Sequence, residues 1–388
     1  MYKIQTYNTI SEDGLFLFKE RGFEVSDSIE NPDAIILRSH QLTPDLIPDS
    51  VKVIGRAGAG VNNIPVDHCS ERCIVVSNAP GANANAVKEL VITALLLSSR
   101  DIVGGVRYLD SIRDKNLDVV SSVEKQKSQF KGVELNGRTL GVVGLGAIGM
   151  MVANAAVGLG MNVFGHDPFI SVQNAWRLSR SVKPVDQLNR LLMDSDYVTL
   201  HMPLIPETHH FLNKERFSQM KDGAVVLNFS RSEIVNEDDI LDALESNKIS
   251  RYVTDFPTQR LLDCDKVLSI PHLGASTTEA ENNCSVMVAN QIVDYLLSGN
   301  VVNSVNYPGC TMPSSDQYSR LTITNRNIPK MLGQVTSVLA DYDINIMDML
   351  NKSRDDIAYT IVDAVCKIPQ DVVDGISAID GVLNVQTF

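Results

Sequence analysis

The sequence contains no apolar stretch long enough to cross a membrane, and its start shows no basic segment followed by an apolar run. The six cysteines form no C-x-x-C pair, so neither a zinc site nor a disulfide framework is indicated. Basic residues are also scarce, because 34 Lys and Arg stand against 47 Asp and Glu and leave a net charge of −13. These absences predict a cytoplasmic protein without a metal site, and they disfavour nucleic acid and membranes as partners.

The composition is that of an ordinary globular chain, with 44% hydrophobic and 21% charged residues. A length of 388 residues is too great for one ordinary core and suits two or three domains. No G-x-S-x-G string is present, which argues against a serine nucleophile.

Three glycines form the turn of a strand-turn-helix pattern in the middle of the chain. An apolar run ends at Gly144, and Gly146 and Gly149 follow at G-x-G-x-x-G spacing before a helix of high apolar density. Such glycines allow the tight turn, the approach of a pyrophosphate and the packing of helix on strand. Asp167 ends the next expected strand, about 20 residues later, where a carboxylate binds the ribose diol and repels a 2′-phosphate. The pattern predicts NAD as the cofactor, held partly by the turn residues Ala147 and Ile148.

Short apolar runs alternate with helical segments along most of the chain. Strands are expected at 3–7, 34–37, 52–54 and 74–77, and again at 197–201, 224–229, 251–255 and 266–270. This alternation predicts α/β architecture with doubly wound parallel sheets: a Rossmann-like NAD-binding domain at 98–286 and a flavodoxin-like substrate-binding domain. A helix at 277–297 is expected to return the chain to the substrate-binding domain, which is the first domain in the sequence. That domain is therefore predicted to be discontinuous, at 1–97 and 287–306, with an active-site cleft beside the NAD-binding domain.

A Pro- and Ser-containing stretch at 307–317 reads as a linker. The remaining residues, 318–388, show the order strand, helix, strand, strand, helix, strand, which predicts a ferredoxin-like βαββαβ unit. A unit of this size has a modest core, so pairing with a second copy is expected.

Two side chains follow strands of the expected parallel sheet and suit hydride transfer, which needs a base and a cation for the substrate carboxylate. Arg231 follows the strand 224–229 and could grip a carboxylate with two hydrogen bonds. His272 follows the strand 266–270, and an imidazole exchanges protons near neutral pH. His201 is placed in the same way, but we expect it to shape the cofactor pocket.

Six ordered motifs resemble the D-isomer-specific 2-hydroxyacid dehydrogenases, and within them the members that carry a C-terminal ACT regulatory domain. They begin at Gly55 (GRAGAGV), Asn78 (NAPGAN), the glycine turn, His201 (HMPLIPET), Leu227 (LNFSRSEIV) and Pro271 (PHLGAST). The resemblance implies NAD-dependent oxidation of 3-phosphoglycerate to 3-phosphohydroxypyruvate, the first step of L-serine biosynthesis.

The resemblance also assigns roles to individual residues. It implies that His272 takes the hydroxyl proton, that Arg231 orients the carboxylate, and that the phosphate meets cations of the first domain. The implied substrate-binding residues are Arg38, Arg56, Asn83 and Lys127. The implied cofactor-binding residues, besides the glycine turn and Asp167, are Ala59, Met202, Pro203, Phe229, Ser230, Asp255, Gly274 and Ala275.

The sequence departs from the family pattern at two places. The family carries a Glu five residues after the position of Asp255, where it pairs with the catalytic His, but here the string is DFPTQR. Asp263 or Asp265 could substitute, or His272 could act alone as a weaker base. In the ACT unit, Lys330 replaces a glycine beside the effector positions Asn325, Asn327 and Asn345. Binding of L-serine there is therefore a hypothesis.

Two other functions fit the same motifs. One is a dehydrogenase of the same chemistry that acts on glyoxylate, hydroxypyruvate or D-lactate, which the pair Arg38 and Arg56 disfavours. The other is an NAD-sensing corepressor, which the absence of disordered-looking tails disfavours. A homodimer or homotetramer is expected.

Overall fold

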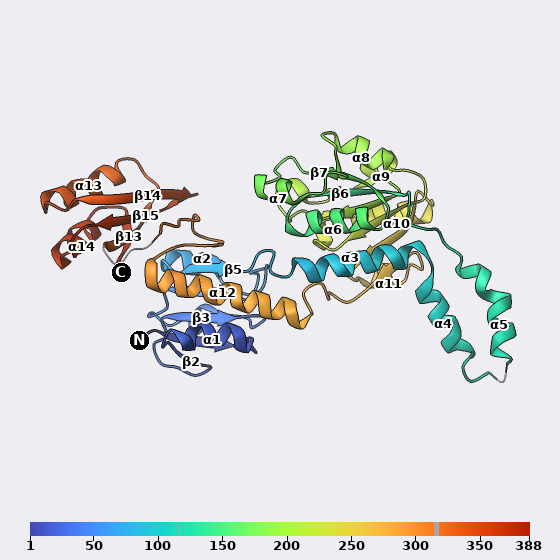
Figure 1. Cartoon of the computed structure of the whole chain (residues 1–388), viewed down its shortest axis with the longest axis horizontal. Coiled ribbons are helices and arrows are strands. Elements are labelled where there is room, and N and C mark those ends of the chain that lie inside the picture. Colours follow the sequence, from blue (N-terminus) through green and yellow to red (C-terminus); the bar gives the residue numbers. More distant parts are fainter. Residues whose placement is uncertain (116, 314–317) are drawn as a thin grey trace. The chain divides into compact units, whose positions relative to one another are not determined.

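The computed structural model describes residues 1–115, 117–313 and 318–388 (Figure 1). The last four residues of the predicted linker, 314–317, lie outside the described residues. The chain forms two compact units: unit 1 consists of Met1–Asn83 and Thr277–Phe388, and unit 2 of Ala84–Ser276. No helix among the described residues has the length and apolarity needed to span a bilayer.

The borders between the units, after Asn83 and after Ser276, differ from the predicted ones after 97 and after 286. The predicted borders cut through two helices, whereas the observed ones fall where these helices begin. The helix α3 (Ala84–Ser99) buries Val91 and Leu95 in the same core as Leu140 of unit 2. The helix α12 (Thr278–Ser298) packs on the first helix of the chain from its second turn onward, where a Cβ on Gly14 would lie 2.9 Å from Cβ of Ser285. Each helix therefore belongs entirely to one unit, α3 to unit 2 and α12 to unit 1.

Unit 1 contains a parallel five-stranded sheet in the order β2-β1-β3-β4-β5, which is the flavodoxin-like order. Its elements are β1 (Lys3–Tyr7), α1 (Glu12–Glu20), β2 (Glu24–Ser26), β3 (Ala34–Leu37), β4 (Val53–Arg56), α2 (Val66–Glu71), β5 (Val75–Asn78) and α12. The residues of β3 are all buried, as expected for a central strand covered on both faces. Gly55 lets α12 pack directly on β4, since a Cβ there would overlap Val288.

Unit 2 contains a parallel seven-stranded sheet in the order β12-β11-β10-β9-β6-β7-β8. The strands are β6 (Thr139–Val143), β7 (Asn162–His166), β8 (Lys183–Pro184), β9 (Tyr197–Leu200), β10 (Ala224–Asn228), β11 (Ile249–Thr254) and β12 (Val267–Ser269). The helices that accompany them are α3, α6 (Ala147–Gly158), α7 (Val172–Arg177), α8 (Leu188–Asp194), α9 (Lys214–Gln219), α10 (Glu237–Glu245) and α11 (Gln259–Leu262). The strand order reverses between β6 and β9, and ligands bind at the carboxyl ends of strands at such a point.

Two helices of unit 2, α4 (Ile102–Ile112) and α5 (Val119–Gln126), form a projecting pair beside the sheet layers of that unit (Figure 1). Ile102, Val106 and Leu109 lie on one face of α4 and are 46%, 55% and 47% exposed. Val120 of α5 is 74% exposed. The pair, called the arm below, therefore presents apolar surface to solvent. The sequence pattern did not predict it.

The C-terminal part of unit 1 is an antiparallel sheet in the order β14-β15-β13-β16, which is the order of the ferredoxin-like fold. Its elements are β13 (Ser319–Arg326), α13 (Met331–Asp341), β14 (Ile346–Arg354), β15 (Ile357–Ala364), α14 (Gln370–Ser377) and β16 (Val382–Thr387). The predicted fold class is thereby confirmed in all three parts. Tyr359 and Ile361 alternate to one face of β15 and join the core of α12, while Val362 faces the helices α13 and α14.

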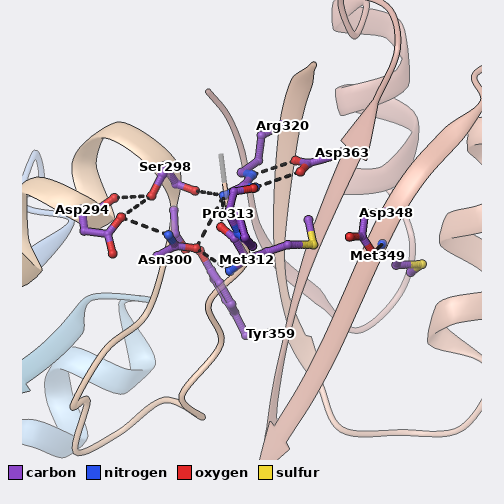
Figure 2. Close-up of polar contacts among 11 residues, drawn as sticks. Asp294, Ser298, Asn300, Met312, Pro313, Arg320, Asp348, Met349, Tyr359 and Asp363 are labelled. Atoms are coloured by element: carbon purple, nitrogen blue, oxygen red, sulfur yellow. Dashed lines mark hydrogen bonds and ion pairs between the residues drawn. The ribbon is translucent and has the colours of Figure 1, made fainter. Parts of the chain in front are cut away.

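An ion pair buried under this sheet holds the C-terminal part to the end of α12 (Figure 2). Arg320 of β13 donates from Nε and Nη2 to the two carboxylate oxygens of Asp363, at 2.7 and 2.8 Å. Its Nη1 also donates to the carbonyl oxygen of Ser298, the last residue of α12, at 3.1 Å. The side chains of the pair are 5% and 6% exposed. The two parts of unit 1 are thus joined by a desolvated and fully bonded charge pair.

Candidate active site

The glycine turn lies at the reversal point of the sheet in unit 2. Gly144 has a φ of 90°, and a Cβ there would lie 2.5 Å from the carbonyl oxygen of His201. A Cβ on Gly149 would overlap the carbonyl oxygen of Gly144. Gly146, in contrast, faces open space, because no described residue other than its own chain neighbours lies within 4 Å of its Cβ position. The first and third glycines are therefore needed by the fold, whereas the second leaves room for a ligand at the N-terminus of α6.

Asp167 connects the end of β7 to this turn. Its Oδ2 accepts a hydrogen bond of 2.8 Å from the backbone N–H of Leu145, and its Oδ1 accepts one of 2.8 Å from that of Phe169. Each carboxylate oxygen has a second lone pair, so a ribose diol can still bind. The glycine turn, the helix N-terminus and this carboxylate fit an adenine dinucleotide.

His201 is fixed in its neutral form. Burial lowers the pKa of its imidazole to about 3. Its Nε2 lies 2.9 Å from Oγ1 of Thr199, which is itself fully buried in β9. The ring therefore carries no charge at neutral pH, as befits a residue that lines a pocket. The next residue, Met202, lies beside the glycine turn, since its backbone nitrogen is 3.1 Å from the Cβ position of Gly144, and Pro203 follows it.

Arg231 stands on a loop that is held from below by a buried amide. Asn228, the last residue of β10, has no exposed surface, and its Nδ2 donates to the carbonyl oxygen of Arg231 at 2.8 Å. Its Oδ1 accepts from the backbone N–H of Ser230 at 3.1 Å, and the Ser230 hydroxyl donates to the carbonyl oxygen of Leu200. The exposed guanidinium is thus presented by a fixed backbone. Phe229, which is 7% exposed, packs beneath it in the core.

Asp255 and His272 lie in the same part of unit 2. Asp255 directly follows β11 and is only 2% exposed, and its Oδ1 has no hydrogen-bond partner among the described residues. Burial raises the pKa of its carboxyl group, and the positive charges of His272 and Arg231 oppose that rise. The ring of Phe256 stands edge-on to the ring of His272, with 4.9 Å between centroids.

The structure therefore brings Arg231, His272 and Asp255 together at the carboxyl ends of strands. Asp263, one of the expected substitutes for the missing Glu, instead accepts a hydrogen bond of 3.0 Å from Gln259 within α11. The buried Oδ1 of Asp255 lacks a donor, which a carboxamide can supply. Gly274 lies against this carboxylate, since its Cβ would be 3.7 Å from Oδ2 of Asp255, and Ala275 follows it in the same turn.

Unit 1 presents its own cations at the carboxyl edge of its sheet. Arg56 ends β4, and Arg38 directly follows β3, its neighbour in the sheet. Nη2 of Arg38 lies 2.6 Å from Oε1 of Glu281 in the first turn of α12. Gly58 leaves room for the Arg56 guanidinium, because a Cβ there would overlap it. Sequence reasoning placed Arg38 at a strand end, whereas the strand expected at 52–54 extends to Arg56 in the structure, and the pairing with Glu281 was missed.

The other expected substrate residues are less fixed. Asn83 is half-buried just before α3, at the border between the two units. Ala59 is exposed, and its carbonyl oxygen accepts from the side chain of Asn78 at 2.5 Å. Lys127 lies at the end of the arm, where its ammonium pairs with Glu124 and is 63% exposed.

The three expected effector residues differ in exposure and in their contacts. Asn325 is 2% exposed and donates to the carbonyl oxygen of Arg326 at 2.7 Å. Asn327 and Asn345 are exposed, and Asn327 donates to the carbonyl oxygen of Asp355 at 3.1 Å. Lys330 keeps a left-handed φ of 73°, a conformation that favours glycine. Among the described residues, no group of His, Cys, Asp and Glu side chains could hold a metal ion.

The chain is similar to known proteins over most of its length. Residues 94–274 match the family model described as D-isomer specific 2-hydroxyacid dehydrogenase, NAD binding domain. D-3-phosphoglycerate dehydrogenase of Haemophilus influenzae is 30% identical over 381 residues, which cover 95% of this chain and 89% of that protein. The enzyme of the same name from Methanocaldococcus jannaschii is 34% identical over 90% of this chain and 67% of its own length.

Solved structures agree with the fold. An NAD⁺-bound 3-phosphoglycerate dehydrogenase of Entamoeba histolytica is 26% identical, with a TM-score of 0.61 over 79% of this chain and 98% of its own. The apo-structure of D-lactate dehydrogenase from Escherichia coli is also 26% identical, with a TM-score of 0.62 over 78% of this chain and 99% of that one. Structural similarity alone therefore does not separate one hydroxy acid from another.

Proposed function

The chain belongs to the D-isomer-specific 2-hydroxyacid dehydrogenase family, and from this premise we propose that it catalyses the NAD-dependent oxidation of 3-phosphoglycerate to 3-phosphohydroxypyruvate, the first step of L-serine biosynthesis. The observation that carries the substrate assignment is the pair of arginines at neighbouring strand ends, Arg38 and Arg56. In a chain of net charge −13, a phosphate needs such a local concentration of positive charge.

The residues of unit 2 supply the chemistry. NAD, when bound, accepts the hydride from C2 of the substrate. Arg231 binds the substrate carboxylate through its guanidinium, and the Asn228 amide fixes the backbone at this position by donating to the Arg231 carbonyl oxygen. His272 takes the hydroxyl proton on its ring nitrogen as the alcohol becomes a ketone. Asp255, whose charge acts on His272, stabilises the imidazolium that this transfer creates.

The cofactor is held by residues that the fold leaves open or unpaired. Gly146 and the N-terminus of α6 accept the pyrophosphate, with Ala147 and Ile148 beside it, and Asp167 binds the ribose diol. The buried Oδ1 of Asp255 accepts a hydrogen bond from the carboxamide. We assign further cofactor contacts to the neutral His201 and to Ala59, Met202, Pro203, Phe229, Ser230, Gly274 and Ala275.

We further propose that the enzyme is a cytoplasmic homo-oligomer. All six cysteines are free thiols, as in a reducing compartment. The apolar face of the arm, with Ile102, Val106 and Leu109, packs against a second copy of the chain. Lys127, which directly follows α5, then lies near the boundary between the two subunits.

L-serine binding to the ACT unit remains a proposal. It is supported by Asn327 and Asn345, which are both exposed. The test is a thermal shift or a kinetic change in millimolar L-serine. Its absence contradicts this role.

The experiment that tests the main proposal is an initial-rate assay of NADH formation with 3-phosphoglycerate, D-glycerate and D-lactate under identical conditions. We expect 3-phosphoglycerate to give the highest kcat/KM. A higher value with D-lactate contradicts the substrate assignment. No NADH with any of the three contradicts the proposed chemistry.

A further inference from the structure

Arg38, which we propose as a phosphate ligand, already pairs with a carboxylate of its own chain. Its Nη2 lies 2.6 Å from Oε1 of Glu281. The two side chains are 35% and 43% exposed, so the pair lies at the surface of the strand edge and is open to an incoming anion. An anion that approaches Arg38 must therefore share the guanidinium with Glu281 or displace its carboxylate.

The backbone of Glu281 is fixed by the helix that carries it. Its N–H donates to the carbonyl oxygen of Thr277, and the hydroxyl of Ser285 donates to the carbonyl oxygen of Glu281 at 2.9 Å. The next residue, Asn282, donates from its side chain to Asp13 of α1 at 2.8 Å. The helix α12 therefore fixes the backbone of Glu281 and holds its carboxylate beside Arg38.

A second observation shows that both arginines converge on this turn. The thiol of Cys284, one turn further along α12, has its pKa raised by burial. The positive charges of Arg56 and Arg38 oppose that rise, and the negative charge of Glu281 adds to it. Glu281 therefore stands in the field of both proposed phosphate ligands.

We propose that Glu281 is an internal competitor for the phosphate-binding guanidinium of Arg38, and that it restricts the site to anions that bind strongly enough to displace it, such as phosphomonoesters. This inference rests on the proposed role of Arg38. A carboxylate ligand carries one negative charge and is equivalent to the group it would displace. A phosphomonoester at neutral pH carries up to two charges and three acceptor oxygens, so it replaces Glu281 with a net gain in attraction. Glu281 thereby lowers the affinity by the same factor for every anion that must displace it, so that a weakly bound anion no longer occupies the site at concentrations where a phosphomonoester still does.

The test is direct binding of inorganic phosphate and of acetate to the full-length protein, by calorimetry, in the wild type and in Glu281→Gln. The substitution keeps the size of the side chain and removes its charge. We expect phosphate affinity to rise about tenfold, as the loss of one repulsive charge near a surface site implies. Acetate affinity should rise by about the same factor, because both anions displace the same carboxylate from Arg38.

Glu279→Gln is the matched control. Glu279 lies in the same first turn of α12 and is exposed, and no ion pair to it is found within the described part of the chain. It removes the same charge from the same helix end without touching Arg38. We expect its phosphate affinity to stay within about twofold of the wild type, since exposed charges are strongly screened. In an Arg38→Ala background, Glu281→Gln should no longer raise phosphate affinity.

The outcomes separate this inference from the proposed function. If Glu281→Gln binds phosphate no more tightly than the wild type, or if Glu279→Gln produces the same gain, the inference is wrong even when 3-phosphoglycerate is oxidised. If Glu281→Gln alone tightens phosphate binding but 3-phosphoglycerate is not oxidised, the substrate assignment fails and the competitor role stands. In an active enzyme, the change should fall mainly on KM for 3-phosphoglycerate and much less on KM for D-glycerate.

Discussion

At the scale of single residues, Asp255 illustrates how a site can act against stability. The carboxyl group is 2% exposed and lacks a partner for Oδ1 among the described residues. Burial raises its pKa despite the opposing charges of His272 and Arg231. Its ionised form therefore favours the unfolded chain. The cost is absent below the unfolded pKa of about 3.9, where both states are protonated, and grows as pH rises through the higher folded pKa.

We therefore expect Asp255→Asn to raise the thermal midpoint at pH 7.5 by about 2 °C or more, with the gain disappearing as pH approaches 4. The same variant should lose activity, because the proposed imidazolium of His272 loses its stabilising charge. Differential scanning calorimetry across this pH range measures the effect.

Asp196→Asn is a control of opposite sign. Burial of Asp196 is outweighed by the N–H of Thr139 and the ammonium of Lys221, which lower the pKa of that carboxyl group. Its substitution should destabilise at neutral pH and lose its effect in acid. A wild type that is more stable than Asp255→Asn at pH 7.5 would falsify this view of the site.

At the scale of elements, the glycines of the turn are required for different reasons. Gly149 is needed for packing, because a Cβ there overlaps the Gly144 carbonyl oxygen, whereas Gly146 faces open space. We expect Gly149→Ala to lower the thermal midpoint and Gly146→Ala to keep it near the wild-type value. Gly146→Ala should still weaken NAD binding about tenfold or more, because its methyl group occupies the space of the pyrophosphate. Fluorescence titration with NADH measures this, and equal effects of the two variants on stability would contradict the distinction.

The strand ends explain why much of the site could be predicted from the sequence. Arg38, Arg231 and His272 each follow an apolar run, and within each of the two sheets the parallel strands bring their carboxyl ends to one edge of that sheet. The arm could not be predicted in this way, since its apolar residues lie on exposed helix faces, where burial periodicity carries no information about the partner. The pairing of Arg38 with Glu281 was also missed, because it joins residues far apart in the chain.

At the scale of the whole molecule, the buried pair Arg320–Asp363 joins the C-terminal part to the rest of unit 1 (Figure 2). The sequence predicted the βαββαβ order but not this junction, because charged residues in strands are ordinarily exposed. Tyr359, Ile361 and Asp363 lie on one face of β15 and are all buried, and the sequence does not show what covers that face.

Removing one member of this pair leaves the other charge buried. We expect Asp363→Asn to destabilise the protein by about 3 kcal/mol, seen as a lower first unfolding transition in calorimetry. Asp110→Asn, which breaks the exposed pair with Arg113, is the control and should cost less than about 1 kcal/mol. If the two variants unfold alike, the junction does not hold the C-terminal part in place.

The central claim is that this chain is a dehydrogenase whose unit 1 recognises phosphate through Arg38. The most direct test is the ratio of kcat/KM for 3-phosphoglycerate to that for D-glycerate, measured in the wild type and in Arg38→Ala. The two substrates differ only in the phosphate. We predict a large ratio in the wild type and a fall of about 100-fold in the variant, as the loss of a charge-assisted contact of about 3 kcal/mol implies. A ratio that is near one in the wild type, or that does not change in the variant, contradicts the account.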